Sequence, residues 1–303
     1  MADRVWTVIE ALDWTRVHLA KHGDPAPRRA AEWLLSAATG LSRVQLYAHH
    51  DRPLTPEERA TFRDSIERRV AGEPLQHITG EVGFRHLVLR VGPGVFIPRP
   101  ETEVLVDVVL RHLGVHGGEA LVADLCAGSG AVALSIAHEC EGARVWAVEA
   151  DPAAAALAAE NADRLGLADA VTVLTGDLFA PLPADLRGRL DAVVANPPYI
   201  PTADLADLPA EVRDREPRAA LDGGADGLDT ARRIMDGARE WLTPGGVLAM
   251  ELDESRVADA DKLMRAWYEG VVSEQDLAQR PRVVAGHAPA KRADPHIRGG
   301  RQP

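Results

Sequence analysis

The chain has 303 residues, of which 46% are hydrophobic and 26% charged, and its formal net charge is −12 at pH 7. This composition is typical of a globular protein, and the length suits two domains of roughly 100 to 200 residues each. Residues 1–77 hold 11 basic and 11 acidic side chains, so residues 78–303 carry the whole excess, with 35 acidic against 23 basic. An extended duplex-binding surface needs Lys and Arg in excess, so this balance argues against direct nucleic-acid binding.

The first residues do not have the pattern of a signal or transit peptide, and no apolar run reaches the ~18 residues that span a bilayer. We therefore expect a cytoplasmic protein that does not bind membranes, and we expect it to be a monomer. Two cysteines, Cys126 and Cys140, are too few for a disulfide framework and are expected to stay reduced.

Residues 1–73 predict a bundle of four or five short helices. Asp24 is a candidate N-cap with Pro25 at the first helical position, and Thr55 with Glu58 fits a capping box. The expected core of this bundle includes Trp6, Trp14, Trp33 and Leu34.

Residues 74–101, rich in β-type residues, glycine and proline, predict a hairpin linker. Residues 102–288 alternate helix and strand, which is typical of an α/β fold with a mostly parallel, doubly wound sheet. Such sheets bind ligands beyond the carboxyl ends of their strands. The tail, 289–303, is expected to be disordered. Strands are predicted at 120–126, 144–150, 171–177, 190–196, 246–252, 271–277 and 281–287, and helices at 102–113, 130–140, 152–165, 226–242 and 254–268, with a long loop at 197–225.

A glycine-rich turn follows the first strand of this sheet. Gly128 and Gly130 permit a tight turn and close approach of a ligand, and the second strand ends in Glu149, placed to accept hydrogen bonds from ribose hydroxyls. Asp124 lies near the charged part of such a cofactor, or else caps the following helix. Asp177 and Leu178, after the third strand, lie beside an adenine, although Leu178 also suits the core. At this point NAD and S-adenosylmethionine both remain possible.

The sequence Asn196-Pro197-Pro198-Tyr199 follows the fourth strand, next to the first. Proline has no N–H, so the turn is stiff and leaves backbone carbonyls as acceptors. With the Asn196 side-chain oxygen and the Tyr199 ring, two acceptors and a flat face match a planar NH2 group. Hydride transfer has no use for this arrangement, so the cofactor is expected to be S-adenosylmethionine. We interpret Asn196, Pro197 and Tyr199 as catalytic and all four residues as substrate-binding.

Several stretches together resemble the protein-(glutamine-N5) methyltransferases that modify peptide chain release factors. They are PLQHITG (74–80), IPRPETE (97–103), DLCAGSGAVALSIA (124–137), NPPYIP (196–201), EVRDREPRAALDGGADGL (211–228) and LTPGG (242–246). The resemblance implies a seven-stranded class I methyltransferase fold after a helical domain, residues 1–73, that recognises the substrate. It also implies that S-adenosylmethionine donates a methyl group to the glutamine of the Gly-Gly-Gln loop in release factors. The product of the cofactor is then S-adenosylhomocysteine.

By motif position, the resemblance places substrate binding at Asn196 to Tyr199. The cofactor site it implies, together with the residues assigned above, consists of Asp124, Cys126, Ala127, Gly128, Ser129, Gly130, Glu149, Asp177, Leu178 and Asn196.

The chain departs from the family pattern at three places. Cys126 and Ala127 replace a Gly-Thr pair, and we expect the loop still to form if the φ angle at Cys126 is negative. Asp253 stands at a glycine position, and His77 replaces a tyrosine.

Two other functions use some of the same motifs: a DNA adenine-N6 methyltransferase, and a cofactor-binding module without catalysis. A metal site is not expected, because His112 and His116 have no evident third ligand. The charged run 213–218 either contacts a partner or orders its own loop through ion pairs.

Overall fold

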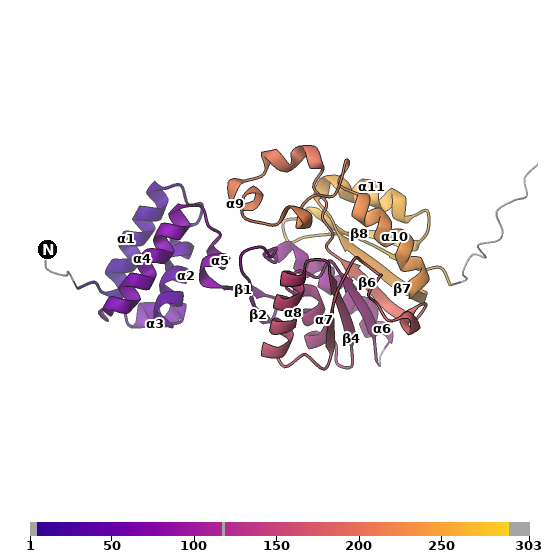
Figure 1. Cartoon of the computed structure of the whole chain (residues 1–303), viewed down its shortest axis with the longest axis horizontal. Coiled ribbons are helices and arrows are strands. Elements are labelled where there is room, and N and C mark those ends of the chain that lie inside the picture. The colour runs from indigo at the N-terminus through magenta and orange to yellow at the C-terminus, as the bar shows by residue number, and fades with distance from the viewer. Residues whose placement is uncertain (1–4, 117–118, 291–303) are drawn as a thin grey trace, which may run out of the picture. The chain divides into compact units, whose positions relative to one another are not determined.

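The computed structural model describes residues 5–116 and 119–290, and the expected tail lies outside these residues from position 291 on. The chain divides into two compact units. The helical unit comprises Met1–Glu81, Val91–Pro93 and Pro209–Arg215, and the sheet unit comprises Val82–Arg90, Gly94–Leu208 and Glu216–Pro303 (Figure 1).

In its described residues, the helical unit contains six short helices, three of which begin at a side-chain cap. Thr7, Ser42 and Thr55 each form a capping box, and the one at Thr55 confirms the prediction. The prediction at Asp24 is wrong: the helix starts at Pro27 with Ala26 as N-cap, because the Asp24 carboxylate accepts from the Ala26 N–H at 2.8 Å in a turn before the helix. The helices are α1 (Val8–Lys21), α2 (Pro27–Thr39), α3 (Arg43–Ala48), α4 (Pro56–Val70), α5 (Leu75–Thr79) and α9 (Ala210–Arg213).

The buried core of this bundle is mostly aliphatic, with Phe62 as its aromatic member. Leu34 is fully buried and Trp6 packs against the core, as expected, and Trp33 is partly buried. Trp14 is not a core residue, since it is 48% exposed and stacks on His18 with ring centroids 4.6 Å apart. A stripe of apolar residues predicts which face of a helix is covered, but not how deeply each position is buried.

The segment predicted as a hairpin begins as helix α5, which ends at Gly80 with a φ of 78°. The hairpin itself is confirmed: β1 (Glu81–Phe84) and β2 (Leu87–Arg90) form a two-stranded sheet. A short 3-10 helix, η1 (Pro100–Thr102), then precedes α6 (Glu103–His116).

The sheet unit is built on a seven-stranded sheet in the order β5-β4-β3-β6-β7-β9-β8. Neighbours from β5 to β7 run parallel, while β9 is antiparallel to β7 and β8. The chain winds outward from β3 to β5 and then returns to place β6 beside β3, so the strand order reverses there. The strands are β3 (Leu121–Leu125), β4 (Arg144–Glu149), β5 (Val171–Thr175), β6 (Leu190–Ala195), β7 (Leu242–Glu251), β8 (Glu269–Gln275) and β9 (Pro281–His287).

Helices cover both faces of this sheet (Figure 1). On one face, Leu125, Val193 and Met250 pack in one buried cluster with residues of α10 (Asp229–Trp241) and α11 (Glu254–Met264). The helices α6, α7 (Ala131–Glu139) and α8 (Pro152–Arg164) pack on the strands from the other side, with α6 against α7. The predicted alternation of strands and helices and the class I methyltransferase architecture are confirmed.

The segment predicted as one long loop, 197–225, contains three short helical turns and a backbone pairing. Ile200 donates its N–H to Leu221 at 2.9 Å, and Gly223 donates to Ile200 at 2.8 Å. A Cβ on Gly223 would lie 2.7 Å from the Pro198 carbonyl oxygen and one on Gly227 2.2 Å from that of Tyr199. The absence of side chains at both glycines therefore lets this loop lie directly on the Asn196–Tyr199 turn. The turns in the loop are η3 (Thr202–Asp207), α9 and η4 (Arg218–Ala220).

The turn from β3 to α7 forms with Cys126 in the left-handed region, at a φ of 62°. The condition expected from the sequence, a negative φ here, does not hold. A side chain in this conformation costs roughly 1–3 kcal/mol and persists only where the surroundings enforce it. The turn therefore forms despite the cysteine, because β3 and α7 hold both of its ends.

We predict that Cys126→Gly raises the free energy of unfolding by about 1 kcal/mol, because glycine adopts this backbone conformation without strain. Chemical denaturation of both proteins measures the change. Cys126→Ala, which removes the thiol and keeps a Cβ, is the control and should not raise the free energy of unfolding. Equal gains in the two variants would show that the gain does not come from relief of backbone strain.

We also predict that Gly223→Ala lowers stability by 1 kcal/mol or more, on the order of an overpacked site, and displaces the Asn196–Tyr199 turn. Thermal unfolding measures the first effect, and a crystal structure of the variant shows the second. Gly83→Ala is a suitable control, since a Cβ there meets no atom within 4 Å. A Gly223→Ala protein that matches the control in both measurements would show that the close approach is not needed.

Candidate functional site

A cavity of about 280 Å³ lies in the sheet unit, beyond the carboxyl ends of β3, β4, β5 and β6. Two predicted residues are outside its lining: Gly130, which begins α7 at a φ of 84°, and Pro197, which is buried. The other predicted residues line it together, namely Asp124, Cys126, Ala127, Gly128, Ser129, Glu149, Asp177, Leu178, Asn196, Pro198 and Tyr199.

The Glu149 carboxylate organises the glycine turn. One oxygen accepts from the Gly128 N–H at 2.8 Å and the other from the Asp151 N–H at 2.9 Å. A carboxylate offers about four lone-pair sites, so acceptor capacity remains for ligand hydroxyls. Gly128 itself has a φ of 57°, and a Cβ there would meet no protein atom within 4 Å. The turn is therefore open where it faces the cavity.

Asp124 lies in the cavity lining and supports the start of α7, although the N-cap residue of that helix is Gly130. Its carboxyl accepts from the Ala133 N–H at 3.0 Å in the first turn of α7. Burial raises the pKa of Asp124 to about 8, and the nearby Glu149 adds to the rise. A positively charged ligand group in the cavity would favour the ionised form.

Asp177 and Leu178, which follow β5, also line the cavity. Asp177 pairs with Arg233 of α10, and Leu178 is buried with a φ of 49°. Within residues 5–116 and 119–290, four non-glycine residues have a positive φ, and two of them, Cys126 and Leu178, line this cavity. Strained backbone gathers at functional sites, because only a rigid surrounding structure maintains it.

Burial raises the pKa of the Cys126 thiol above its ordinary value, with Glu149 as the next cause. The group is therefore a neutral thiol at physiological pH and a poor nucleophile. Cys126 serves this cavity as a small lining residue.

Asn196 leaves β6 at the point where strand order reverses, and its amide Nδ2 donates to Thr102 Oγ1 at 3.4 Å. No backbone N–H in the described part of the chain donates to the Pro197 carbonyl oxygen. Tyr199 lines the cavity, and burial, followed by the charge of Glu251, raises the pKa of its hydroxyl. The turn thus brings a neutral phenol side chain and a side-chain amide to the same cavity.

The sequence reasoning missed cavity residues supplied by two motifs that it had noted without a role, IPRPETE and EPRAAL. Arg99 of the first motif pairs with the buried Glu216 of the second, and the Arg99 guanidinium lies 5.1 Å from the Phe96 ring centroid. This ion pair joins two segments that both reach the cavity. The lining residues that these motifs supply are Pro98 and Thr102 of the first and Pro217, Ala219, Ala220 and Leu221 of the second, and Phe96, directly before the first motif, lines the cavity as well.

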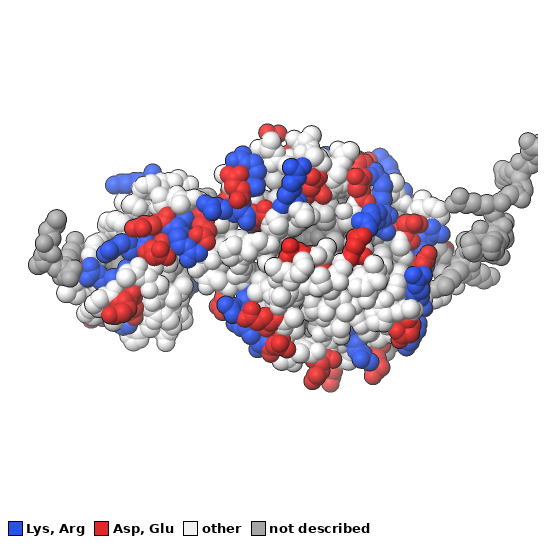
Figure 2. All heavy atoms as spheres, viewed as in Figure 1, with Lys and Arg blue, Asp and Glu red and all other residues white. Residues whose placement is uncertain are grey.

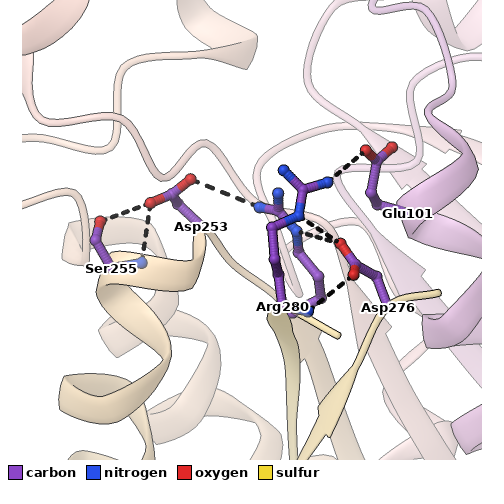
Figure 3. A network of polar contacts seen from close by, with 6 residues as sticks. Glu101, Asp253, Ser255, Asp276 and Arg280 are labelled. Carbon is purple, nitrogen blue, oxygen red and sulfur yellow. Dashed lines mark hydrogen bonds and ion pairs between the residues drawn. The ribbon is translucent and has the colours of Figure 1, made fainter. Parts of the chain in front are cut away.

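A network of charged side chains holds η1 against the far ends of β7 and β9 (Figure 3). Arg280 contacts Glu101 at 3.1 Å and Asp276 at 3.2 Å. Arg282 links the same Asp276 to Asp253, at 3.2 and 3.5 Å. Asp253, at the family's glycine position, is the N-cap of α11 and accepts from the Ser255 N–H at 3.0 Å. The departure at this position therefore starts a helix.

Asn161 of α8, fully buried, ties the glycine turn to the hairpin. Its amide donates to the carbonyl oxygens of Arg90 and Ser129, both at 3.0 Å, and accepts from the Arg90 N–H at 2.8 Å. One side chain thus satisfies three backbone groups, which fixes the turn beside the cavity.

Other candidates from the sequence do not add to this site. No cluster of three metal-ligating side chains occurs in residues 5–116 and 119–290, and the His112 ring lies beside that of His287, with centroids 5.2 Å apart and the planes tilted by 36°. The side chain of His116 lies outside the described residues. Across the described chain, none of the helices is both long and apolar enough to cross a bilayer. Glu216 of the charged run 213–218 is the exception, through its pair with Arg99, whereas other members of the run form ion pairs within their own loop, as Arg213–Asp214 and Arg218–Asp222.

Two family models match the chain: the PrmC N-terminal domain over residues 10–80 and the methyltransferase small domain over residues 88–208. A ribosomal RNA methyltransferase of T. Thermophilus, solved in complex with AdoMet and guanosine, is 22% identical and covers 69% of this chain and 49% of its own, with a TM-score of 0.51. This similarity concerns the fold alone.

Similarity in sequence is higher among curated proteins. The release factor glutamine methyltransferase of Geobacter sulfurreducens is 50% identical over 82% of this chain and 84% of its own length. The release factor glutamine methyltransferase of Moorella thermoacetica is 48% identical over 86% of this chain and 90% of its own length. The chain therefore belongs to the release factor glutamine methyltransferase family.

Proposed function

We propose that this protein transfers a methyl group from S-adenosylmethionine to the side-chain amide nitrogen of the glutamine in the Gly-Gly-Gln loop of peptide chain release factors. The observation that carries the proposal is a single cavity lined by both the glycine turn of β3 and the Asn196–Tyr199 turn of β6. Membership of the family supports it.

The cavity residues fit an adenosine-containing cofactor. Glu149 would accept from ribose hydroxyls, Leu178 and Asp177 would flank the adenine, and Asp124 would face the positive charge. Cys126, Ala127, Gly128 and Ser129 would approach the cofactor through the turn. When bound, S-adenosylmethionine supplies an electrophilic methyl group on a sulfonium centre.

The turn after β6 would bind the substrate amide. The Asn196 oxygen and the Pro197 carbonyl each take one N–H of the planar NH2 group, and Pro198 and Tyr199 enclose it. An amide nitrogen is a weak nucleophile, because its lone pair is delocalised. Holding it in line with the methyl carbon can contribute roughly 7–11 kcal/mol. Acceptors that strengthen as the nitrogen becomes positive stabilise the transition state further.

Two rival functions predict different products. A DNA adenine-N6 methyltransferase would use the same turn, but residues 78–303 carry 35 acidic and 23 basic side chains. Figure 2 shows both signs interspersed over the face in view, without a broad basic surface. A binding module without catalysis would bind the cofactor and transfer nothing.

The proposal extends to the whole chain. Residues 1–73 would recognise the release factor, residues 74–101 would act as the linker, and residues 102–288 would carry the reaction, in a cytoplasmic monomer that binds no nucleic acid.

Incubation with labelled S-adenosylmethionine and a full-length release factor tests the reaction, with mass spectrometry to locate the product. We expect one added methyl group on the Gly-Gly-Gln glutamine and none on a Gln→Glu release factor. Label in DNA instead would establish the first rival, and cofactor binding without label in either would establish the second.

Asn196→Ala is expected to lower methyl transfer at least a hundredfold, on the order of losing an oxyanion-type contact, while the thermal unfolding temperature stays near that of the parent. Single-turnover kinetics at saturating cofactor measure the chemical step. Full activity in this variant would remove Asn196 from the mechanism.

Glu149→Ala is expected to weaken cofactor binding tenfold or more, since hydrogen bonds to a charged group are worth about 1.5–3 kcal/mol each. Titration calorimetry with S-adenosylmethionine measures the dissociation constant. Glu160→Ala, at an exposed position of α8 paired with Arg90, is the control and should bind as the parent does. Equal affinity in both variants would contradict the assignment of Glu149.

A further inference from the structure

Two segments of the sheet unit hold the Asn196–Tyr199 turn between them. At the start of the turn, Asn196 Nδ2 donates to the Oγ1 atom of Thr102, the last residue of η1, at 3.4 Å. At its end, Ile200 donates its N–H to the carbonyl oxygen of Leu221, directly after η4, at 2.9 Å. The turn is therefore held by a different segment at each end.

Both of these flanking segments also line the cavity. We call residues 96–102 the first wall and residues 216–221 the second wall. The lining residues of the first wall are Phe96, Pro98 and Thr102, and those of the second wall are Pro217, Ala219, Ala220 and Leu221. A shift of either wall would therefore change the shape of the cavity as well as the position of the turn.

An ion pair joins the two walls to each other. The Arg99 guanidinium donates to the Glu216 carboxylate, and the Glu216 side chain is 1% exposed whereas that of Arg99 is 32% exposed. The pair closes a ring of contacts that runs from the first wall through Thr102 to the turn, and from the turn through Leu221 to the second wall. Because each wall in this ring has a neighbour on both sides, the ion pair sets the distance between the walls.

The first wall is also anchored outside this ring. The Thr102 N–H donates to the Arg99 carbonyl oxygen at 3.1 Å, and Glu101, which lies between them, pairs with Arg280 at 3.1 Å (Figure 3). The backbone at the base of the Arg99 side chain is therefore fixed. Through this side chain, the buried carboxylate of Glu216 is tied to a rigid part of the fold.

A buried ion pair suits this task better than it suits stabilisation. The cost of removing two charges from water offsets much of their attraction, so such a pair adds little net stability. A guanidinium and a carboxylate do, however, meet in a directional geometry that apolar side chains do not impose. Precise placement matters here, since a displacement of about 1 Å at a reacting group can slow a reaction about a hundredfold.

We propose that Arg99 and Glu216 are positioning residues, which hold the two walls at the separation that lets a glutamine side chain reach Asn196 in line with the methyl group. Neither of the two side chains lines the cavity, so both act through the walls. The inference rests on the proposed function, because the position of Asn196 matters for the rate only if this residue binds the substrate amide.

Glu216→Gln tests the proposal, because it keeps the shape of the side chain and leaves only the partly exposed Arg99 without its partner charge. We expect the single-turnover methyl-transfer rate at saturating cofactor and release factor to fall about tenfold or more. The cofactor dissociation constant should stay within about twofold of the parent value. The reason is that Glu149, at the end of β4, and the glycine turn after β3 lie outside the ring. A rate equal to that of the parent would overturn the inference.

Arg218→Gln is the matched control. Arg218 lies in the second wall and pairs with Asp222 at 3.0 Å, but its side chain is 71% exposed and both partners belong to the same loop. The variant removes an ion pair without separating the walls, so its rate should stay near that of the parent. Equal losses in Arg218→Gln and Glu216→Gln would show that the rate responds to the charge of the loop and not to the link between the walls.

The double variant Arg99→Met with Glu216→Leu separates position from stability. Apolar residues that replace a buried ion pair often leave stability unchanged or raise it. We expect an unfolding temperature near or above that of the parent, together with a rate still reduced about tenfold or more. Recovery of the parent rate would show that packing alone holds the walls and would overturn the inference, whether or not Glu216→Gln folds.

These outcomes can be told apart from failure of the proposed function. If the parent protein adds no methyl group to the glutamine of a release factor, the proposed function fails before any variant is compared. If the parent is active and Glu216→Gln is equally active, only this inference fails.

Discussion

The direct approach of two backbones, residues 198–200 and 221–227, is the contact on which the site depends. Gly223 and Gly227 have no side chains to hold these segments apart, and hydrogen bonds between Ile200, Leu221 and Gly223 join them. The two prolines in the turn have no N–H to donate in a hydrogen bond. Ile200, which follows them in the chain, finds its backbone partners in the neighbouring loop, at Leu221 and Gly223. The position of Asn196 beside β3 is therefore set both by β6, which it follows, and by the loop 221–227.

Regular structure in this chain was predictable because its signals are local. Apolar segments that alternate with helical segments along the chain predict all seven strands of the main sheet, and the capping box at Thr55 predicts the start of a helix. The cavity was predictable as well, since the glycine turn, Glu149 and Asn196 each follow a strand, and parallel strands end at one edge. Spacing and residue type carried these predictions without any knowledge of packing.

What could not be predicted depends on contacts between distant segments. Thr102 looks like an ordinary helix-start residue until η1 packs beside Asn196. Trp14 fits an apolar stripe but lies at its exposed edge, and Asp24 forms a turn in place of the expected cap. The left-handed backbone at Cys126 is imposed by the strand and helix on either side, so residue type alone pointed the other way.

Asn161 has a consequence for how this sequence can vary. The residue is outside the lining of the cavity, yet its amide is both donor and acceptor for backbone groups of two separate segments. Aspartate there would lose the donors, leucine would lose every partner, and glutamine would need room that a fully buried position does not provide. Natural variation at position 161 is therefore expected to be as narrow as at a residue that touches substrate. The reason is only that this side chain forms hydrogen bonds with three buried backbone groups.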